Sequence, residues 1–256
     1  MDKIKTAVIT GGGSGIGKCA VIRLLSEGWT VWALDNSEAS LGELASACAD
    51  KHALHTCTCD VSSSDSIQNA FDLIKQTSDS IDALICSAGV IHTGSLESHS
   101  PEQVDRLLDV NIKGPWLTVR QALPLLRIGA SIQDPSRVVL VGSIGGIRPK
   151  VGSGMYSATK AALHVLTGVY AVELGADGIT VNAVAPGTVD TPMVRALAEA
   201  NSNSSYKPSG DSPLGRVAQP EDIVDAIGFF LSDGAKYVNG AVLPVDGGTR
   251  AAFVKV

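Results

Sequence analysis

Short apolar runs alternate with longer segments of helical period along the chain of 256 residues. In several runs nearly every side chain is apolar, as in Val138-Val139-Leu140-Val141, which is typical of strands in a parallel sheet covered on both faces. The pattern predicts strands at Thr6 to Thr10, Thr30 to Leu34, Ala53 to Thr58, Ala83 to Cys86, Arg137 to Gly142, Thr180 to Ala185 and Ala241 to Val245. It predicts helices near 16–27, 38–50, 64–77, 101–127, 156–174 and 220–232.

This alternation of strands and helices indicates the fold class. Regular alternation predicts an α/β fold, a doubly wound Rossmann-type arrangement with a parallel sheet of about seven strands. No internal repeat, charge block or linker divides the chain, and its length and 45% hydrophobic content suffice for one core, so we expect a single domain over 1–256. Ligands of such folds bind at the carboxyl ends of the strands, and we expect the functional residues there.

Charge and composition narrow the classes of partner. The net charge is -6 and no run of Lys or Arg occurs, so nothing in the chain would attract nucleic acid or anionic lipid. No apolar stretch reaches the roughly 20 residues that span a bilayer, and no signal-peptide pattern precedes the first predicted strand. We therefore expect a cytoplasmic protein with no nucleic-acid or membrane partner. The five cysteines, at spacings unlike those of metal or redox pairs, predict reduced thiols and no metal site.

A glycine-rich turn, Thr10-Gly11-Gly12-Gly13-Ser14-Gly15-Ile16-Gly17, ends the first predicted strand and opens a predicted helix. Glycine permits positive φ and lets the backbone approach a pyrophosphate, whose charge then faces the helix N-terminus. A glycine motif alone is more often an ordinary turn, but its position after the first strand favours a phosphate site. The candidate residues are Gly11, Gly13, Ser14, Gly15, Ile16 and Gly17.

Asp35 closes the second predicted strand, 20 residues after Gly15. An acidic side chain at this spacing can accept hydrogen bonds from the adenosine ribose hydroxyls and would repel a 2′-phosphate. No Arg or Lys flanks Asp35 in Leu34-Asp35-Asn36-Ser37, and Ser14 is uncharged, so the sequence favours NAD over NADP. The alternative for Asp35 is a cap for the following helix.

Tyr156 and Lys160 stand four residues apart at the beginning of a predicted helix and therefore on one face. Ser143 precedes the tyrosine by thirteen residues, at the end of a predicted strand. A free tyrosine titrates near 10, but a nearby ammonium and a positive nicotinamide ring favour the phenolate, which can then accept the proton released with a hydride. Alone, such a pair is more often a chance surface contact. Here the helix is apolar almost all round, which indicates burial against the sheet and another subunit.

With these residues assembled, the sequence resembles the short-chain dehydrogenase/reductase family over essentially its whole length. Similar motifs occur in the family's order: the loop from Thr10 to Gly17, Asp60-Val61, Ala88-Gly89, Asn111, Ser143, Tyr156 with Lys160, and Pro186-Gly187. One departure is visible, because the family often has Asn before Ala-Gly where this chain has Ser87.

The resemblance implies an NAD-dependent oxidoreductase that moves a hydride between nicotinamide and the carbon of a secondary alcohol or ketone. Tyr156 would be the general acid/base and also a cofactor contact, Ser143 would bind the substrate oxygen, and Lys160 would also hold the nicotinamide ribose. Asn111 would orient a water in a proton relay from Lys160. Family members are usually tetramers, so a homotetramer is implied. The other implied cofactor contacts are Asp60 and Val61 to the adenine, Ala88 and Gly89 beside its ribose, and Pro186, Gly187, Val189 and Thr191 around the nicotinamide.

Several local and functional alternatives stay open. Asn111 can be a local backbone-bonding residue, Asp60 a helix cap and Pro186-Gly187 a simple turn. A 3-oxoacyl-thioester (acyl-carrier-protein) reductase that uses NADPH is a second candidate, since residues 213–216 and 220–222 resemble that branch, although Asp35 counts against it. A non-catalytic nucleotide-sensing scaffold is a third, and the complete catalytic set counts against it.

No motif identifies the substrate. We expect its pocket around His92 to Leu96, Gly145 to Met155 and 193–212, within a substrate loop at about 190–215 that is either an ordered lid or disordered. Arg148 and Lys150 can meet an anionic substrate or be solvated loop charges, and the second interpretation is favoured. Two hydroxyl-rich stretches favour a small polar substrate such as a sugar or polyol. The turn at 246–248 is expected at a subunit contact.

Overall fold

The computed structural model describes residues 4–48, 53–200 and 211–252 of the chain. Its strands form one sheet of seven, in the order β3-β2-β1-β4-β5-β6-β7, and all neighbouring strands are parallel. This order reverses direction between β1 and β4, as in a doubly wound Rossmann-type fold, so the predicted fold class is confirmed. The strands are β1 (Thr6–Thr10), β2 (Thr30–Asp35), β3 (Leu54–Thr58), β4 (Ala83–Cys86), β5 (Ser136–Val141), β6 (Ile179–Pro186) and β7 (Val242–Val245).

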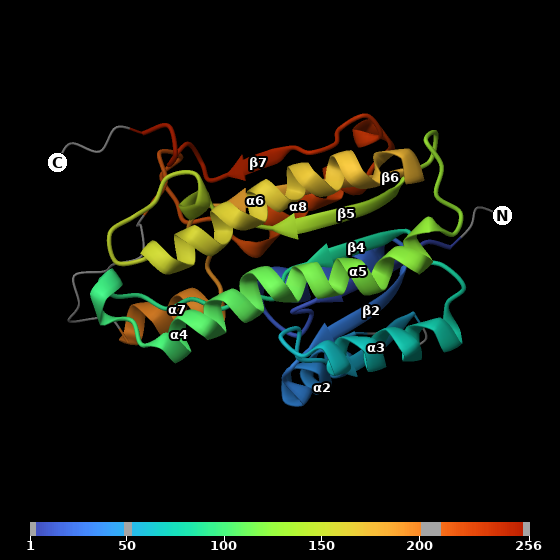
Figure 1. The fold of residues 1–256 in the computed structure, drawn as a ribbon, viewed down its shortest axis with the longest axis horizontal. Coiled ribbons are helices and arrows are strands. Elements are labelled where there is room, and N and C mark those ends of the chain that lie inside the picture. The colour runs from blue at the N-terminus through green and yellow to red at the C-terminus, as the bar shows by residue number, and fades with distance from the viewer. Residues whose placement is uncertain (1–3, 49–52, 201–210, 253–256) are drawn as a thin grey trace.

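Helices cover both faces of the sheet (Figure 1). One core forms where α3, α5 and α6 pack on the sheet, and a second forms on the opposite face beneath α1, α2 and α8. Successive residues of β1 serve the two cores in turn: Val8 belongs to the first, whereas Ala7 and Ile9 belong to the second. Burial on both faces explains why central strands such as β1, β4 and β5 are apolar at nearly every position, whereas the edge strand β3 is partly exposed and more polar. The helices that form these two layers are α1 (Gly15–Ser26), α2 (Glu38–Ala47), α3 (Ser64–Thr77), α5 (Gly114–Arg127), α6 (Gly154–Leu174) and α8 (Pro220–Leu231).

Two segments differ from the helices that the sequence predicts. The helix expected over 101–127 is divided into α4 (Pro101–Leu108), a π-helical turn (Asp109–Lys113) and α5. A further helix, α7 (Pro192–Ala200), lies inside the expected substrate loop at 190–215, so the beginning of that loop is ordered. Residues 201–210, which hold most of the polar segment expected there, lie outside the described residues.

The carboxyl ends of the strands point to the side of the molecule where α4 and α7 lie, at the left of Figure 1. The residues at the end of each strand therefore lie at this edge: the glycine loop and Ser143 follow strands, and Asp35 is the last residue of β2. Across the described part of the chain, no helix combines the length and the apolar character that crossing a membrane requires.

Candidate active site

A cleft of about 320 Å³ runs along the carboxyl ends of the strands, across the point where the strand order reverses. This is the place where doubly wound folds bind ligands. Three predicted residues, Gly13, Gly17 and Asn111, are not part of its lining and pack behind it. The predicted residues that line it are Gly11, Ser14, Gly15, Ile16, Asp35, Asp60, Val61, Ala88, Gly89, Ser143, Tyr156, Lys160, Pro186, Gly187, Val189 and Thr191.

The glycine loop is closed by backbone contacts that leave no space for side chains. Gly11 has φ +67°, and a Cβ there would lie 2.8 Å from the backbone nitrogen of Ala88. A Cβ on Gly17 would lie 2.1 Å from the carbonyl oxygen of Gly11. Ser14 is the N-cap of α1 but makes no side-chain capping bond, and the first turn of α1 holds no acidic residue. The N-terminus of α1 thus faces the cleft with its dipole uncompensated, which fits a pyrophosphate.

Asp35 joins the end of β2 to the glycine loop. Its Oδ2 atom accepts a 3.0 Å hydrogen bond from the backbone N–H of Gly13, and its Oδ1 atom accepts one of 3.0 Å from Ser37. The cap of α2 is Ser37, whose Oγ accepts a hydrogen bond from the backbone of Ser40. Asp35 is therefore not the helix cap and instead presents a fixed carboxylate at the cleft.

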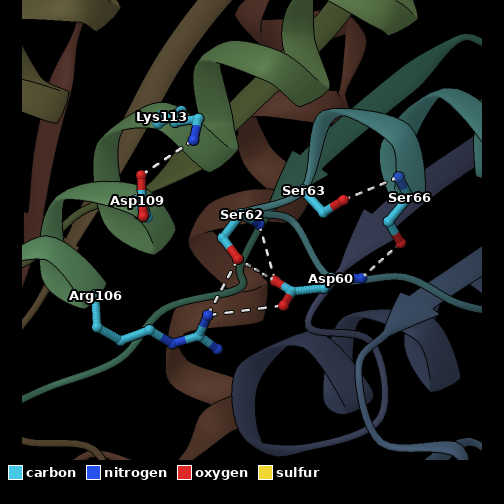
Figure 2. A network of polar contacts seen from close by, with 7 residues as sticks. All are labelled: Asp60, Ser62, Ser63, Ser66, Arg106, Asp109 and Lys113. Carbon is cyan, nitrogen blue, oxygen red and sulfur yellow. Dashed lines mark hydrogen bonds and ion pairs between the residues drawn. The ribbon is translucent and has the colours of Figure 1, made fainter. Parts of the chain in front are cut away.

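Asp60 follows β3 and is held by a set of serine contacts (Figure 2). Its Oδ1 atom accepts hydrogen bonds from the backbone N–H and the Oγ of Ser62, at 2.9 and 2.6 Å, and its own N–H donates to Ser66 Oγ at 3.0 Å. Burial raises the pKa of Asp60, but the bonds from Ser62 and the charge of Arg106 outweigh it and leave the pKa below its usual value. Ser63 caps α3, so Asp60 is not that cap either.

Ser143 and Tyr156 converge at the other end of the cleft. Ser143 follows β5, and its Oγ accepts a 3.1 Å hydrogen bond from the backbone N–H of Gly145. A Cβ on Gly145 would lie 3.3 Å from Ser143 Oγ and 3.8 Å from a ring carbon of Tyr156, so both side chains border the same small space. The Nζ atom of Lys160, one helical turn along α6, lies 5.8 Å from the centre of the Tyr156 ring.

Lys160 is buried and holds its charge against the end of β5. Its Nζ atom donates a 2.8 Å hydrogen bond to the carbonyl oxygen of Val141. Burial lowers the pKa of Lys160 from 10.5 to about 8. At neutral pH the side chain is thus still largely protonated, and a cation lies beside Tyr156, where it favours the phenolate.

Asn111 lies in the π-helical turn and is fully buried. Its Oδ1 accepts a 2.9 Å bond from the N–H of Val90, while Nδ2 donates to the Val90 carbonyl at 2.9 Å and to Thr159 Oγ1 at 3.1 Å. It thereby ties the loop after β4 to α6, and its partners are distant in sequence rather than local. A Cβ on Gly89 would lie 3.4 Å from Asn111 Oδ1 and 3.6 Å from Lys160 Nζ, so the two groups approach the same point.

Comparison with known proteins agrees with this geometry. A family model described as Enoyl-(Acyl carrier protein) reductase matches residues 11–250. The cyclopentanol dehydrogenase of Comamonas testosteroni is 33% identical over 251 residues, which cover 96% of this chain and 97% of that protein. The chain belongs to the short-chain dehydrogenase/reductase family. It is an oxidoreductase of CH–OH groups in a family that binds a nicotinamide cofactor.

Other members of the family show the same extent of similarity. The 3-oxoacyl-(acyl-carrier-protein) reductase of Thermotoga maritima is 33% identical over 250 residues, 95% of this chain and 97% of that protein. The crystal structure of a 3-ketoacyl-(acyl-carrier-protein) reductase from Brucella melitensis, complexed with NADH, has a TM-score of 0.87 at 28% identity and covers 96% of this chain and 98% of that one. The family thus includes both dehydrogenases of simple alcohols and reductases of acyl thioesters.

The cleft of this short-chain dehydrogenase/reductase also contains residues that the sequence reasoning missed. Most of them flank a predicted motif and could have been included by adjacency. Arg106 of α4 had no such signal, because it reaches the cleft from a helix face. Met193 and Val194 of α7 also line the cleft, and they belong to the segment 193–212 that the sequence analysis expects around the substrate. The missed lining residues are Asn36, Cys59, Ser87, Val90, Arg106, Val110, Val141 and Gly142.

Two of the three segments that were expected to shape the substrate pocket lie elsewhere. Residues 92–96 and 145–155 are not part of the cleft lining within the described chain. Arg148 donates from Nη1 to the carbonyl of Thr249, so it anchors the C-terminal turn rather than a ligand. Partial burial lowers the pKa of Lys150, which also lies outside the lining.

Proposed function

We propose that the protein is an NAD(H)-dependent dehydrogenase/reductase in which Tyr156 is the general acid/base for hydride transfer between nicotinamide and the carbon of a secondary alcohol or ketone. The observation that carries this proposal is the convergence of Ser143 and Tyr156 on Gly145, beside the buried ammonium of Lys160. Nicotinamide, when bound, supplies or accepts the hydride. The protein's own residues then have to transfer one proton and bind the substrate oxygen.

The hydrogen-bond directions suit that task. Ser143 Oγ accepts from the backbone of Gly145, so its own hydrogen is free to donate to a substrate oxygen. In the reducing direction the Tyr156 hydroxyl donates its proton to that oxygen, and the ammonium of Lys160 stabilises the phenolate left behind. In the oxidising direction the same phenolate accepts the alcohol proton. Asn111, whose Oδ1 approaches the same point beside Gly89 as Lys160 Nζ, would orient a water through which the proton returns to solvent.

The contacts of Asp35 favour NAD over NADP. Both carboxylate oxygens are held by backbone N–H groups, of Gly13 and Ser37, so the negative charge cannot turn away from an incoming 2′-phosphate. The cation at the same end of the cleft, Arg106, is engaged with Ser62 and Asp60. The loop residues Gly11, Ser14, Gly15 and Ile16 would hold the pyrophosphate, and Pro186, Gly187, Val189 and Thr191 would surround the nicotinamide.

Two substrate classes follow from different observations. A sugar or polyol remains the prediction from the hydroxyl-rich segments, one of which lies mostly outside the described residues. A compact cyclic alcohol is a second candidate, because Met193 and Val194 give the cleft an apolar wall and the similar protein of Comamonas testosteroni is a cyclopentanol dehydrogenase. Asp35 still counts against an NADPH-dependent acyl-thioester reductase.

The assembly and setting stay as predicted from the sequence: one catalytic domain over 1–256, a homotetramer, and a cytoplasmic location without nucleic-acid partners. Support for the assembly comes from α6, which carries the catalytic pair and exposes three apolar side chains, Val165, Val169 and Val172. An apolar stripe on an outer helix is typical of a subunit contact.

Titration with NADH and with NADPH, followed by nicotinamide fluorescence, tests the proposal. Tight NADH and weak NADPH binding is the expected result. Turnover is then measured with NAD on a panel of polyols, aldoses, cyclic secondary alcohols and hydroxyacyl thioesters. Preference for NADPH with turnover only on thioesters would replace the proposal by the acyl-thioester reductase, and binding of neither cofactor would favour the scaffold.

A further inference from the structure

His164 lies on α6 in line with the proposed catalytic pair. It follows Lys160 by four residues and Tyr156 by eight, so the three side chains share one face of the helix. Its ring is partly buried, and its Nε2 atom is buried without a hydrogen-bond partner in the described part of the chain. No step of the proposed reaction uses this imidazole.

The turn at 142–146, here called the Ser143 turn, closes around the ring. A Cβ on Gly142 would lie 2.3 Å from His164 Nε2, and a Cβ on Gly146 would lie 2.8 Å from its Cε1. The Cβ on Gly146 would also lie 2.7 Å from backbone atoms of α6, so turn and helix touch directly there. The imidazole is therefore wedged between the two ends of the turn, and glycine at both ends leaves the space that the ring occupies.

Lys160 is the charged group that faces the ring. Burial lowers the pKa of His164 from 6.5, and the ammonium of Lys160 lowers it further. The Ser143 turn and β6 contain no titratable side chain, and the one on β5, Arg137, belongs to the opposite end of that strand. On α6 itself, Tyr156 lies one helical turn beyond Lys160. No carboxylate of the described residues is among the groups that shift the pKa of His164, so an imidazolium here has no counter-charge.

Protonation changes what the ring requires. A neutral imidazole can leave Nε2 as a lone pair, whereas an imidazolium carries a hydrogen on both nitrogens. The carbonyl oxygen of Val184 borders the same space, 3.1 Å from the Cβ position of Gly142, but it already accepts the N–H of Gly142 at 2.8 Å. A hydrogen on Nε2 thus stays unpaired in the interior or competes for the bond that joins the turn to β6. It also adds a second buried cation beside Lys160, and both costs are relieved when the turn moves away from α6.

We propose that His164 is a positioning residue: its neutral ring holds the Ser143 turn at its working distance from Tyr156, and protonation of the ring releases the turn and stops turnover in acid. This inference rests on the proposed function and adds a titrating group to it. In the reducing direction Tyr156 has to donate a proton, so its own titration does not lower the rate in acid. A loss of reduction at low pH therefore reports on His164.

The first test is the pH profile of ketone reduction by NADH, with cyclopentanone or the ketone of the panel alcohol that turns over fastest. We measure kcat from about pH 5 to about pH 9, a range that covers the titration of histidine. Wild-type kcat should fall by about threefold or more toward the acid end. His164→Asn and His164→Gln, which cannot titrate, should stay within about threefold of wild type at about pH 8 and lose the acid fall. His55→Asn removes a histidine that stacks on Trp32 at the edge of the sheet and should keep the wild-type profile.

The second test needs no substrate. Chemical unfolding of the protein without cofactor should show a stability that falls as the pH drops below 6.5, because the unfolded chain then binds a proton that folded His164 excludes. The fall should be smaller in His164→Asn and His164→Gln than in the wild type and in His55→Asn.

Two results would overturn the inference. One is an acid loss of kcat that is absent from the wild type or that persists unchanged in both His164 variants. The other is an unfolding free energy with the same pH dependence in the wild type and in both variants, whether or not a substrate is known. In either case NADH still binds and the proposed function stands. If the wild type binds neither NADH nor NADPH, the proposed function fails, and this inference fails with it.

Discussion

Lys160 on α6 donates a 2.8 Å hydrogen bond from Nζ to the carbonyl oxygen of Val141, the last residue of β5. Ser143 follows two residues later, so one contact fixes the helix that carries Tyr156 relative to the turn that carries Ser143. The same contact places a cation in the interior, where burial lowers its pKa to about 8. The arrangement that orients the proposed catalytic groups thus costs stability whenever Lys160 is charged.

This cost predicts a pH dependence of folding for the protein without cofactor. Lys160 has a pKa of about 8 when folded and 10.5 when unfolded, so between these values the unfolded chain binds the additional proton. Stability from this group therefore rises with pH across the window and is lowest below about pH 8. Between about pH 7.5 and about pH 10 the gain is about 2 kcal/mol. Chemical unfolding of the wild type and of Lys160→Met across this pH range measures the gain. The difference between the two proteins isolates the contribution of Lys160, because all other groups titrate in both. If the free energy of unfolding changed with pH in the same way for both proteins, the lowered pKa of Lys160 would be contradicted.

Tyr156→Phe removes the hydroxyl and keeps the ring. We expect turnover to fall by about a thousandfold or more, since the proton transfer and its stabilisation by Lys160 are both lost. NADH affinity should stay within about twofold of wild type, because the substitution keeps all the other proposed cofactor contacts along the cleft. Steady-state kinetics and nicotinamide fluorescence measure the two effects. Substantial residual turnover would show that another group handles the proton.

Local sequence patterns predicted the parts of the site that depend on local geometry. The glycine loop follows from strand, turn and helix in direct succession, and Tyr156 and Lys160 share a face because one helical turn separates them. Strand boundaries agree to within about a residue because runs buried on both faces have sharp ends. Family resemblance supplied the remaining motif positions.

Features that depend on contacts between distant segments were not predictable in this way. The helix expected over 101–127 is interrupted by a π-helical turn, in which Asn111 bonds the backbone of Val90 and the side chain of Thr159. No periodicity in the sequence indicates these contacts of Asn111. Arg106 reaches the cleft only because α4 packs over the loop after β3, a relation that flanking residues cannot show.

Asp35→Ala tests the choice of cofactor. The substitution removes the fixed negative charge at the end of β2, and we expect the preference for NAD over NADP to fall by about tenfold or more. Asp35→Asn serves as the matched control for the loop, because its amide oxygen can still accept the bond from Gly13 or Ser37. The ratio of kcat/KM for the two cofactors gives the result. An unchanged ratio in both variants would limit Asp35 to holding the glycine loop.

Gly142 packs so closely against the ring of His164 that a side chain at position 142 would have to displace this ring. A Cβ on Gly142 would lie 2.3 Å from His164 Nε2, between β5 and α6 and next to Ser143. Gly142→Ala should therefore destabilise the protein by about 1–3 kcal/mol, the usual cost of overpacking. His164→Ala removes the obstructing ring, so the double variant should be more stable than the sum of the two single losses by at least about 1 kcal/mol.

Thermal or chemical unfolding of the four proteins completes this cycle. Gly228→Ala replaces Gly142→Ala in a control cycle, since a Cβ on Gly228 of α8 meets nothing within 4 Å. The stability changes of Gly228→Ala and His164→Ala should therefore add in the double variant. Turnover adds a functional measure: because Ser143 directly follows Gly142, the displaced ring in Gly142→Ala should lower kcat, and His164→Ala should restore part of it. Additive stabilities in the first pair would mean that the turn accommodates the methyl group by moving away from α6 instead.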